Sequence, residues 1–149
     1  MPVTGATGFQ RFFRIAADLD VDKDDLKRYQ EFVQRKVYDL LVVGRAAAGA
    51  NGRDVIIPSD LPITKGLQQC THDFRRIEGE VELEPILAQM ATFPPLGAEL
   101  AVDTEERLPT IVGGLSVALG RAFKVIDPDV RNPQMQQWER AFRIFDLLL

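Results

Sequence analysis

Apolar residues recur every three or four positions along almost the whole chain of 149 residues. That spacing places apolar side chains on one face of an α-helix, whereas a half-buried strand alternates apolar and polar residues. Glycine, proline, asparagine and aspartate interrupt the pattern at intervals and divide it into separate helices. These helices follow the order short, long and medium, and the same order then repeats. The pattern therefore predicts an all-α protein built from two similar units.

The first half of the sequence predicts three helices. A short helix is expected over residues 9–16, and a long helix begins at Asp22, whose side chain is a good N-cap, and continues to about residue 48. At 1.5 Å per residue this second helix would be about 40 Å long. Pro58-Ser59-Asp60 is typical of a helix start, so a third helix is expected from there to about residue 77.

The second half repeats this organisation after an acidic segment around Gly79, which predicts a linker. The string Leu100-Ala101-Val102-Asp103 matches Leu19-Asp20-Val21-Asp22 at a shift of 81 residues, and a long helix is expected after each string. Pro109 lies within the second long helix and should either bend that helix or mark its start. Asn132-Pro133 combines an N-cap residue with an N1 proline and predicts the start of the last helix.

An arginine and an aspartate in the first half point to a specific fold. Arg53 lies in the loop after the long helix, and Asp60 follows seven residues later at the expected start of the third helix. A guanidinium and a carboxylate in this arrangement would hold the loop against the fold through paired hydrogen bonds. Together with the helix order, these two residues make residues 5–77 resemble a core histone. The resemblance implies a histone fold in which Arg53 and Asp60 form a structural clamp.

Residues 82–149 resemble a second, more degenerate histone-fold unit, because Arg131 has no aspartate at the matching spacing. Histone folds bury their apolar faces by pairing around crossing central helices. The resemblance therefore implies an intramolecular pseudodimer that forms one compact domain over residues 1–149. In this respect the chain is similar to a small family of bacterial proteins with two histone folds per chain. Gly113 and Gly114 in the second long helix favour a close crossing of two helices.

The charge balance argues against a protein that coats nucleic acid. The chain has 18 basic and 22 acidic residues, a net charge of −4. Residues 1–76 carry 12 basic and 10 acidic residues, whereas residues 77–149 carry 6 and 12. Because DNA binding depends on neutralising phosphates, any DNA-binding surface is expected in the first half. The resemblance to histones implies four candidate DNA contacts there, namely Arg11, Arg14, Lys23 and Arg53.

Two functions remain open from the sequence. One is weak, sequence-independent binding to the phosphate backbone of double-stranded DNA through the first unit, opposed by Asp103, Glu105 and Glu106 of the second unit. The other is a protein-interaction module, for heterodimerisation or assembly, that does not bind DNA. In that case the basic residues form an ordinary solvated face and Arg53 serves only as a clamp.

The sequence predicts a non-enzymatic protein without a cofactor, metal or small-molecule substrate. Cys70 and His72 are the only residues of their kinds, and their spacing on a helix prevents a nucleophile–base pair. The segment Val3–Phe9 lacks the third glycine and the preceding strand of a dinucleotide-binding loop. Long uninterrupted apolar runs and a signal peptide are not visible, so we expect no membrane association and a cytoplasmic location, at the nucleoid if DNA is bound.

Overall fold

The computed structural model describes residues 5–149 and confirms the all-α class. Two short strands, β1 (Val55–Ile56) and β2 (Glu99–Leu100), and one 3-10 turn, η1 (Pro58–Asp60), complete the structure. The six α-helices are α1 (Gly5–Ala17), α2 (Lys23–Ala50), α3 (Lys65–Val81), α4 (Glu84–Met90), α5 (Val102–Ile126) and α6 (Met135–Leu148).

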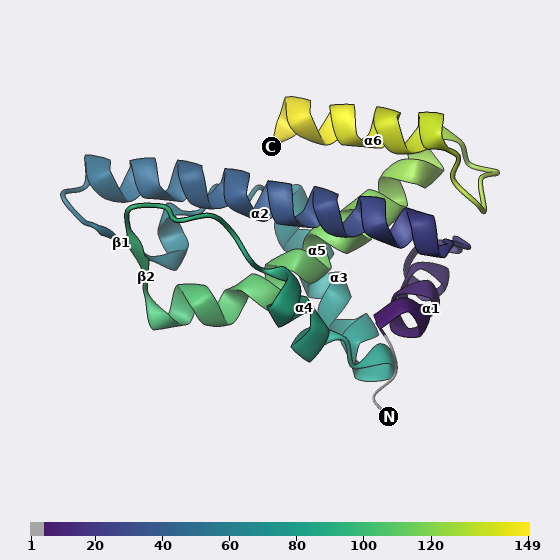
Figure 1. Ribbon diagram of the computed structural model, residues 1–149, viewed down its shortest axis with the longest axis horizontal. Coiled ribbons are helices and arrows are strands. Elements are labelled where there is room, and N and C mark those ends of the chain that lie inside the picture. Colours follow the sequence, from purple (N-terminus) through teal and green to yellow (C-terminus); the bar gives the residue numbers. More distant parts are fainter. Residues whose placement is uncertain (1–4) are drawn as a thin grey trace.

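The two long helices α2 and α5 cross near the middle of the molecule (Figure 1). At the crossing, the buried hydroxyls of Tyr29 and Ser116 are 2.5 Å apart. Ser116 donates its own proton to the carbonyl of Val112, so the Tyr29 hydroxyl is the donor between the two helices. Helices α1, α3 and α4 pack on α5, and α6 lies along α2.

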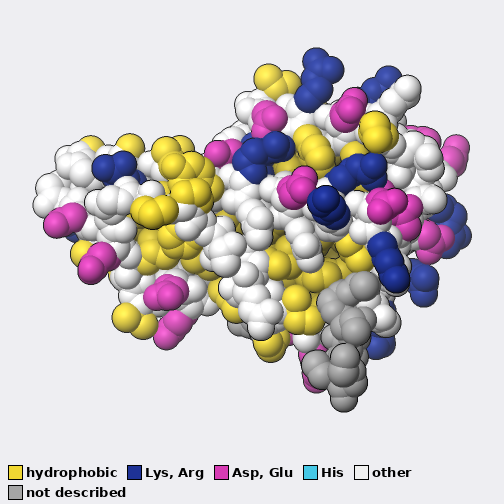
Figure 2. Space-filling view, in the orientation of Figure 1, with side chains coloured by type: hydrophobic (Ala, Val, Ile, Leu, Met, Phe, Trp, Pro, Cys, Tyr) yellow, Lys and Arg dark blue, Asp and Glu magenta, His cyan; other side chains and the backbone are white. Residues whose placement is uncertain are grey.

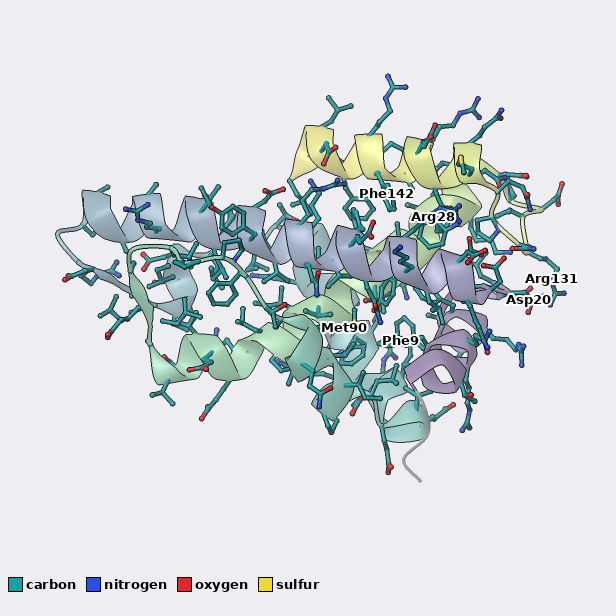
Figure 3. All side chains as sticks on the ribbon, in the orientation of Figure 1. Phe9, Asp20, Arg28, Met90, Arg131 and Phe142 are labelled. Atoms are coloured by element: carbon teal, nitrogen blue, oxygen red, sulfur yellow. The ribbon has the colours of Figure 1, made fainter. Side chains whose placement is uncertain are left out.

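Loops from the two halves of the chain meet at both ends of the molecule. At one end, β1 pairs in parallel with β2, with Val55 opposite Glu99 and Ile56 opposite Leu100. At the other end, the backbone N–H of Asp20 donates to the carbonyl of Arg131 at 2.6 Å, and Figure 3 shows both residues at this end. Each end therefore joins a loop of the first half to a loop of the second half.

One continuous core contains side chains from both halves of the chain. The ring of Tyr29 makes edge contacts with Phe9 and Phe13, and these contacts fix α1 on the start of α2. In the second half, Phe123 on α5 makes an edge contact with Trp138 on α6. Across the two halves, Phe74 of α3 is buried and packs directly against Gly113 of α5.

Helix α3 starts and ends later than the sequence predicted. Residues 58–60 form only the 3-10 turn η1, and α3 begins at Lys65 with Thr64 as its N-cap. The interruption follows from Pro62, because a residue that precedes proline is restricted to extended backbone and Leu61 has ψ 135°. At its other end α3 continues through Gly79 to Val81, so the predicted linker around Gly79 is helical.

Two helices of the second half also differ from the prediction. Helix α5 is continuous from Val102 and contains Pro109, so this proline does not mark a helix start. The helix tolerates the lost backbone hydrogen bond there because Leu108 and Ile111, on either side of the proline, are buried. Helix α6 begins after Gln134 rather than after Asn132, and there the backbone N–H of Gln134 donates to the side-chain oxygen of Gln137.

The close approach at Gly113 and Gly114 involves α3 rather than the other long helix. A Cβ atom at Gly113 would lie 2.4 Å from the ring of Phe74, and one at Gly114 would lie 2.3 Å from Thr71 Oγ1. Helix α5 is also long and apolar enough by composition to cross a membrane, which the sequence analysis did not expect. Because 61% of its most apolar stretch is buried inside the protein, α5 has the properties of a core helix.

Candidate functional site

Arg53 and Asp60 form a bidentate pair at the end of the molecule that contains β1 and β2. Arg53 donates from Nη1 and Nη2 to the two carboxylate oxygens of Asp60 at 2.6 and 2.8 Å. The carboxylate also accepts the backbone N–H of Ile57 at 2.9 Å, and Arg53 donates to the carbonyl of Val55. The pair therefore ties together the loop after α2, strand β1 and turn η1.

These contacts shift the pKa of both side chains. The hydrogen bonds from Arg53 lower the pKa of Asp60 to about 2, although burial of the carboxyl opposes the change. The same hydrogen bonds raise the pKa of Arg53. The Asp60 side chain is 4% exposed and that of Arg53 is 32% exposed, so the carboxylate is enclosed and the guanidinium is partly accessible.

The other basic candidates lie at the opposite end of α2. Arg11 and Arg14 are exposed on α1, and Lys23 is exposed at the first residue of α2. Arg53 lies three residues beyond Ala50, the last residue of α2, and at 1.5 Å per residue this helix separates it from Lys23 by about 40 Å. The structure therefore brings three of the four candidates to one end and places Arg53 at the other.

Acidic residues neutralise part of the charge at the α1 end. Arg14 lies 3.5 Å from Asp20, and Arg131 of the second half lies 3.7 Å from Asp20 and 3.4 Å from Asp18. Lys23 and Arg11 form no ion pair within residues 5–149. The position of Arg131 beside Asp20 could not be predicted from the sequence, because only the contact between the two loops brings these residues together.

Helices α2 and α6 are joined by a buried lysine. Lys36, whose side chain is 2% exposed, donates to Asp39 at 3.2 Å and to Asp146 on α6. The hydrogen bond from Lys36 lowers the pKa of Asp146. Beside this contact the rings of Phe32 and Phe142 stack at 4.8 Å, and Figure 3 shows Phe142 between the two helices. The last turn of α6 is therefore fixed beside the middle of α2.

Exposed apolar side chains surround the point where α6 ends beside α2. Leu147 is 85% exposed and Leu148 is 73% exposed, although both follow directly after the anchored Asp146. Figure 2 shows hydrophobic side chains at this end of α6 and along the C-terminal half of α2. We call the exposed apolar residues of these two helices the α2/α6 apolar surface, which comprises Val42 and Val43 of α2 and Ile144, Leu147 and Leu148 of α6.

Neither a nucleophile–base pair nor a metal-ligand cluster is found in the part of the chain that the structure describes. Groups of three or more His, Cys, Asp or Glu side chains that could hold an ion do not occur there. Cys70 is half-buried, with Arg121 near its sulfur, and burial raises the pKa of its thiol. His72 lies on another side of α3 and is exposed. The described surface therefore offers binding chemistry from guanidinium groups and apolar side chains.

Proteins similar to this chain come from Thermus thermophilus and Aquifex aeolicus. A crystal structure of a Thermus thermophilus protein shares 49% sequence identity, a TM-score of 0.87 and 97% coverage of both chains. A crystal structure of an Aquifex aeolicus protein, at 24% identity, shares the fold with a TM-score of 0.84 and full coverage of both chains.

One uncharacterized protein of Aquifex aeolicus (strain VF5) is 26% identical over 142 residues, which are 95% of this chain and 82% of the relative. A second is 29% identical over 133 residues, 80% of this chain and 77% of its own. Residues 9–146 match the family described as a domain of unknown function, DUF1931, and the chain belongs to this family.

Proposed function

We propose that the chain is a histone-fold pseudodimer in which one unit, residues 5–77, packs against a second unit, residues 82–149, in a single compact domain. The repeated helix order and the crossing of α2 with α5 support this proposal. The strongest support is the pairing of loops at both ends, because each pair takes one loop from each unit. The bidentate contact between Arg53 and Asp60 is a further feature that the first unit shares with core histones.

The function that the geometry supports best is a non-enzymatic protein-interaction module, and the α2/α6 apolar surface is the observation that carries it. Large apolar side chains exposed together on a protein surface are typical of sites that bind another protein. Leu147 and Leu148 are mostly exposed, although the neighbouring Asp146 and Phe142 are anchored on α2. The surface is thus presented by a fixed helix, which lowers the entropic cost of binding.

The partner that this surface fits is a second copy of the same chain. Two copies related by a twofold axis present the same patch to each other, so the patch must be complementary to itself. Charges of both signs border the α2/α6 apolar surface: Arg143 forms no ion pair within residues 5–149, while Asp39 and Asp146 are partly exposed. A twofold arrangement could place Arg143 of each copy beside an acidic residue of the other.

Sedimentation velocity over a range of concentrations tests this association. The wild-type chain should shift from monomer to dimer as concentration rises, and Leu147→Glu should remain monomeric because two copies would bury like charges. Val125→Glu is a matched control, because Val125 is 82% exposed but lies in the last turn of α5, outside this surface. A wild-type chain that stays monomeric throughout, or a dimer that survives Leu147→Glu, would show that this surface does not bind a second copy.

Weak DNA binding is the second candidate function, and it rests on the accessibility of Arg11 and Lys23 at the α1 end. Because the acidic residues Asp18 and Asp20 lie beside Arg14 and Arg131, few phosphates could be neutralised there. Because Arg14 is ion-paired and Arg53 lies at the other end of α2, about two phosphate contacts remain, so the logarithm of affinity should fall against log salt with a slope of about −2.

Electrophoretic mobility shifts with two unrelated duplexes, measured across salt concentrations, test this second candidate. Binding should be independent of sequence, should be lost in Lys23→Glu, and should strengthen when Asp103, Glu105 and Glu106 are neutralised together. If no shift is seen at low salt, the chain does not bind DNA and the interaction module stands alone.

A further inference from the structure

The surface between α3 and the N-terminal half of α5 is hollowed into a groove of about 870 Å³. This size falls within the range of small-molecule sites, roughly 300–1,000 Å³. One wall is formed by His72 and Arg75 on α3, and the opposite wall by Arg107 on α5. Ile63 and Ile111 contribute apolar lining. The groove does not include the α2/α6 apolar surface or any of the four candidate DNA contacts.

The groove lies beside the closest contact between α3 and α5. They meet where Phe74 and Thr71 pack against Gly113 and Gly114, and any Cβ atom at those glycines would collide with α3. Pro58, Ser59, Leu61 and Ile63, from the segment that precedes α3, also line the groove. These packed elements set the shape of the groove, so a ligand would meet a largely formed site.

The arginines that line the groove differ in their ion pairing from the other arginines of α3 and α5. Arg76 and Arg121 both pair with the buried carboxylate of Asp73, at 2.8 and 2.7 Å, and hold its pKa at about 2. Arg75 and Arg107, by contrast, form no ion pair with any residue in the range 5–149. The groove therefore has an unneutralised guanidinium on each wall.

We propose that this groove binds a small organic anion, with a phosphate or carboxylate group held between Arg75 and Arg107. Guanidinium groups suit both anions, because their N–H groups match two oxygens at once. The apolar portion of the ligand would lie against Ile63 and Ile111. Asp103 is the acidic residue in the lining, and its carboxylate opposes the anion from the α5 wall.

Titration of the full-length, ¹⁵N-labelled chain with phenyl phosphate, followed by NMR, tests the proposal. Phenyl phosphate combines an anion with an apolar ring, phenylacetate replaces the phosphate by a carboxylate, and phenol supplies the ring without the charge. We expect saturable shifts in α3 and the first half of α5 with at least one of the two anions, and which anion binds identifies the preferred group. Phenol should give no saturable shift in these elements. The proposal fails if neither anion gives saturable shifts there at millimolar concentrations, or if phenol binds as tightly as the anions.

Variants then test whether the named side chains bind the anion. Arg75→Gln and Arg107→Gln should each weaken binding by about tenfold, because each removes a charge-assisted hydrogen bond. Asp103→Asn should tighten binding, an effect that mere damage to the fold would not produce. Arg140→Gln is the matched control, because Arg140 is an exposed arginine on α6 outside the groove. Equal weakening by Arg140→Gln would show general charge attraction and would overturn the assignment of this groove.

Discussion

The backbone N–H of Asp20 donates to the carbonyl of Arg131 at 2.6 Å and thereby joins the loop after α1 to the loop after α5. At the opposite end of the molecule, the N–H of Ala101 donates to the carbonyl of Ile56 at 3.0 Å. Both contacts cross from the first half of the chain to the second. Because they lie beyond opposite ends of α2, the two halves are held together at both ends of this helix.

The contact between Arg53 and Asp60 should contribute to stability in a pH-dependent way. Arg53→Gln and Asp60→Asn should each lower the midpoint of thermal unfolding by several degrees, because the first removes the charged two-pronged donor and the second removes the negative charge and one of the two acceptor oxygens. The folded pKa of Asp60 is lowered from 3.8 to about 2, so the stability that the carboxylate adds is complete above the unfolded pKa and is lost as the pH falls through about 2.

A double-mutant cycle at neutral pH, repeated at lower pH, measures this contribution. The two single variants should be coupled at neutral pH, and the advantage of the wild-type chain over Asp60→Asn should shrink below about pH 4. Additive effects of the two substitutions would mean that the pair does not act as a clamp.

Glycines on α5 and α3 should respond to alanine in opposite directions. Gly113→Ala should destabilise the protein by about 1–3 kcal/mol, because its Cβ would lie 2.4 Å from the ring of Phe74. Gly79→Ala should stabilise it by roughly 0.5–1 kcal/mol, because Gly79 is inside α3 and nothing lies within 4 Å of an added Cβ. Urea unfolding of both variants checks the pair, and a Gly113→Ala chain as stable as the wild type would contradict the close crossing.

Removing one partner of Lys36 should cost more stability than removing the lysine itself. Asp146→Asn leaves the buried ammonium of Lys36 with only Asp39, so it should cost about 1–2 kcal/mol. Lys36→Met should cost less, because it fills a similar volume without a charge and leaves only carboxylates that water can reach. Chemical denaturation compares the two variants. A larger loss for Lys36→Met would show that the ion pair itself is the main source of stability.

The sequence predicted the helix order and the start of α2 well, because those features depend on local patterns. Asp22 caps α2 through a reciprocal contact with Asp25, as an aspartate before a helical repeat predicts. The prediction around Gly79 was wrong because glycine marks either a helix end or an exposed helical position, and the sequence alone does not distinguish them. Likewise Gly113 indicated a close crossing, but only tertiary packing selects α3 as its partner.

The candidate sites depended more strongly on tertiary contacts. The spacing of Arg53 and Asp60 could be read from the sequence, because both belong to one loop and the turn that follows it. The ion pairs of Arg14 and Arg131 with Asp20 could not, because they require the two halves to meet. Leu147 at the end of α6 lies off its buried stripe, but only the packing of α6 beside α2 forms the apolar surface to which it belongs.

The central claim is that each half of the chain needs the other to fold, and separated halves test it most directly. Residues 1–82 and residues 83–149 would be produced as two fragments, divided between α3 and α4. Alone, each should be largely unfolded or self-associated, because the contacts of Tyr29 with Ser116 and of Phe74 with α5 are lost. An equimolar mixture should regain the helical circular dichroism signal and a cooperative thermal transition. A fragment of residues 1–82 that unfolds cooperatively as a monomer would contradict the account.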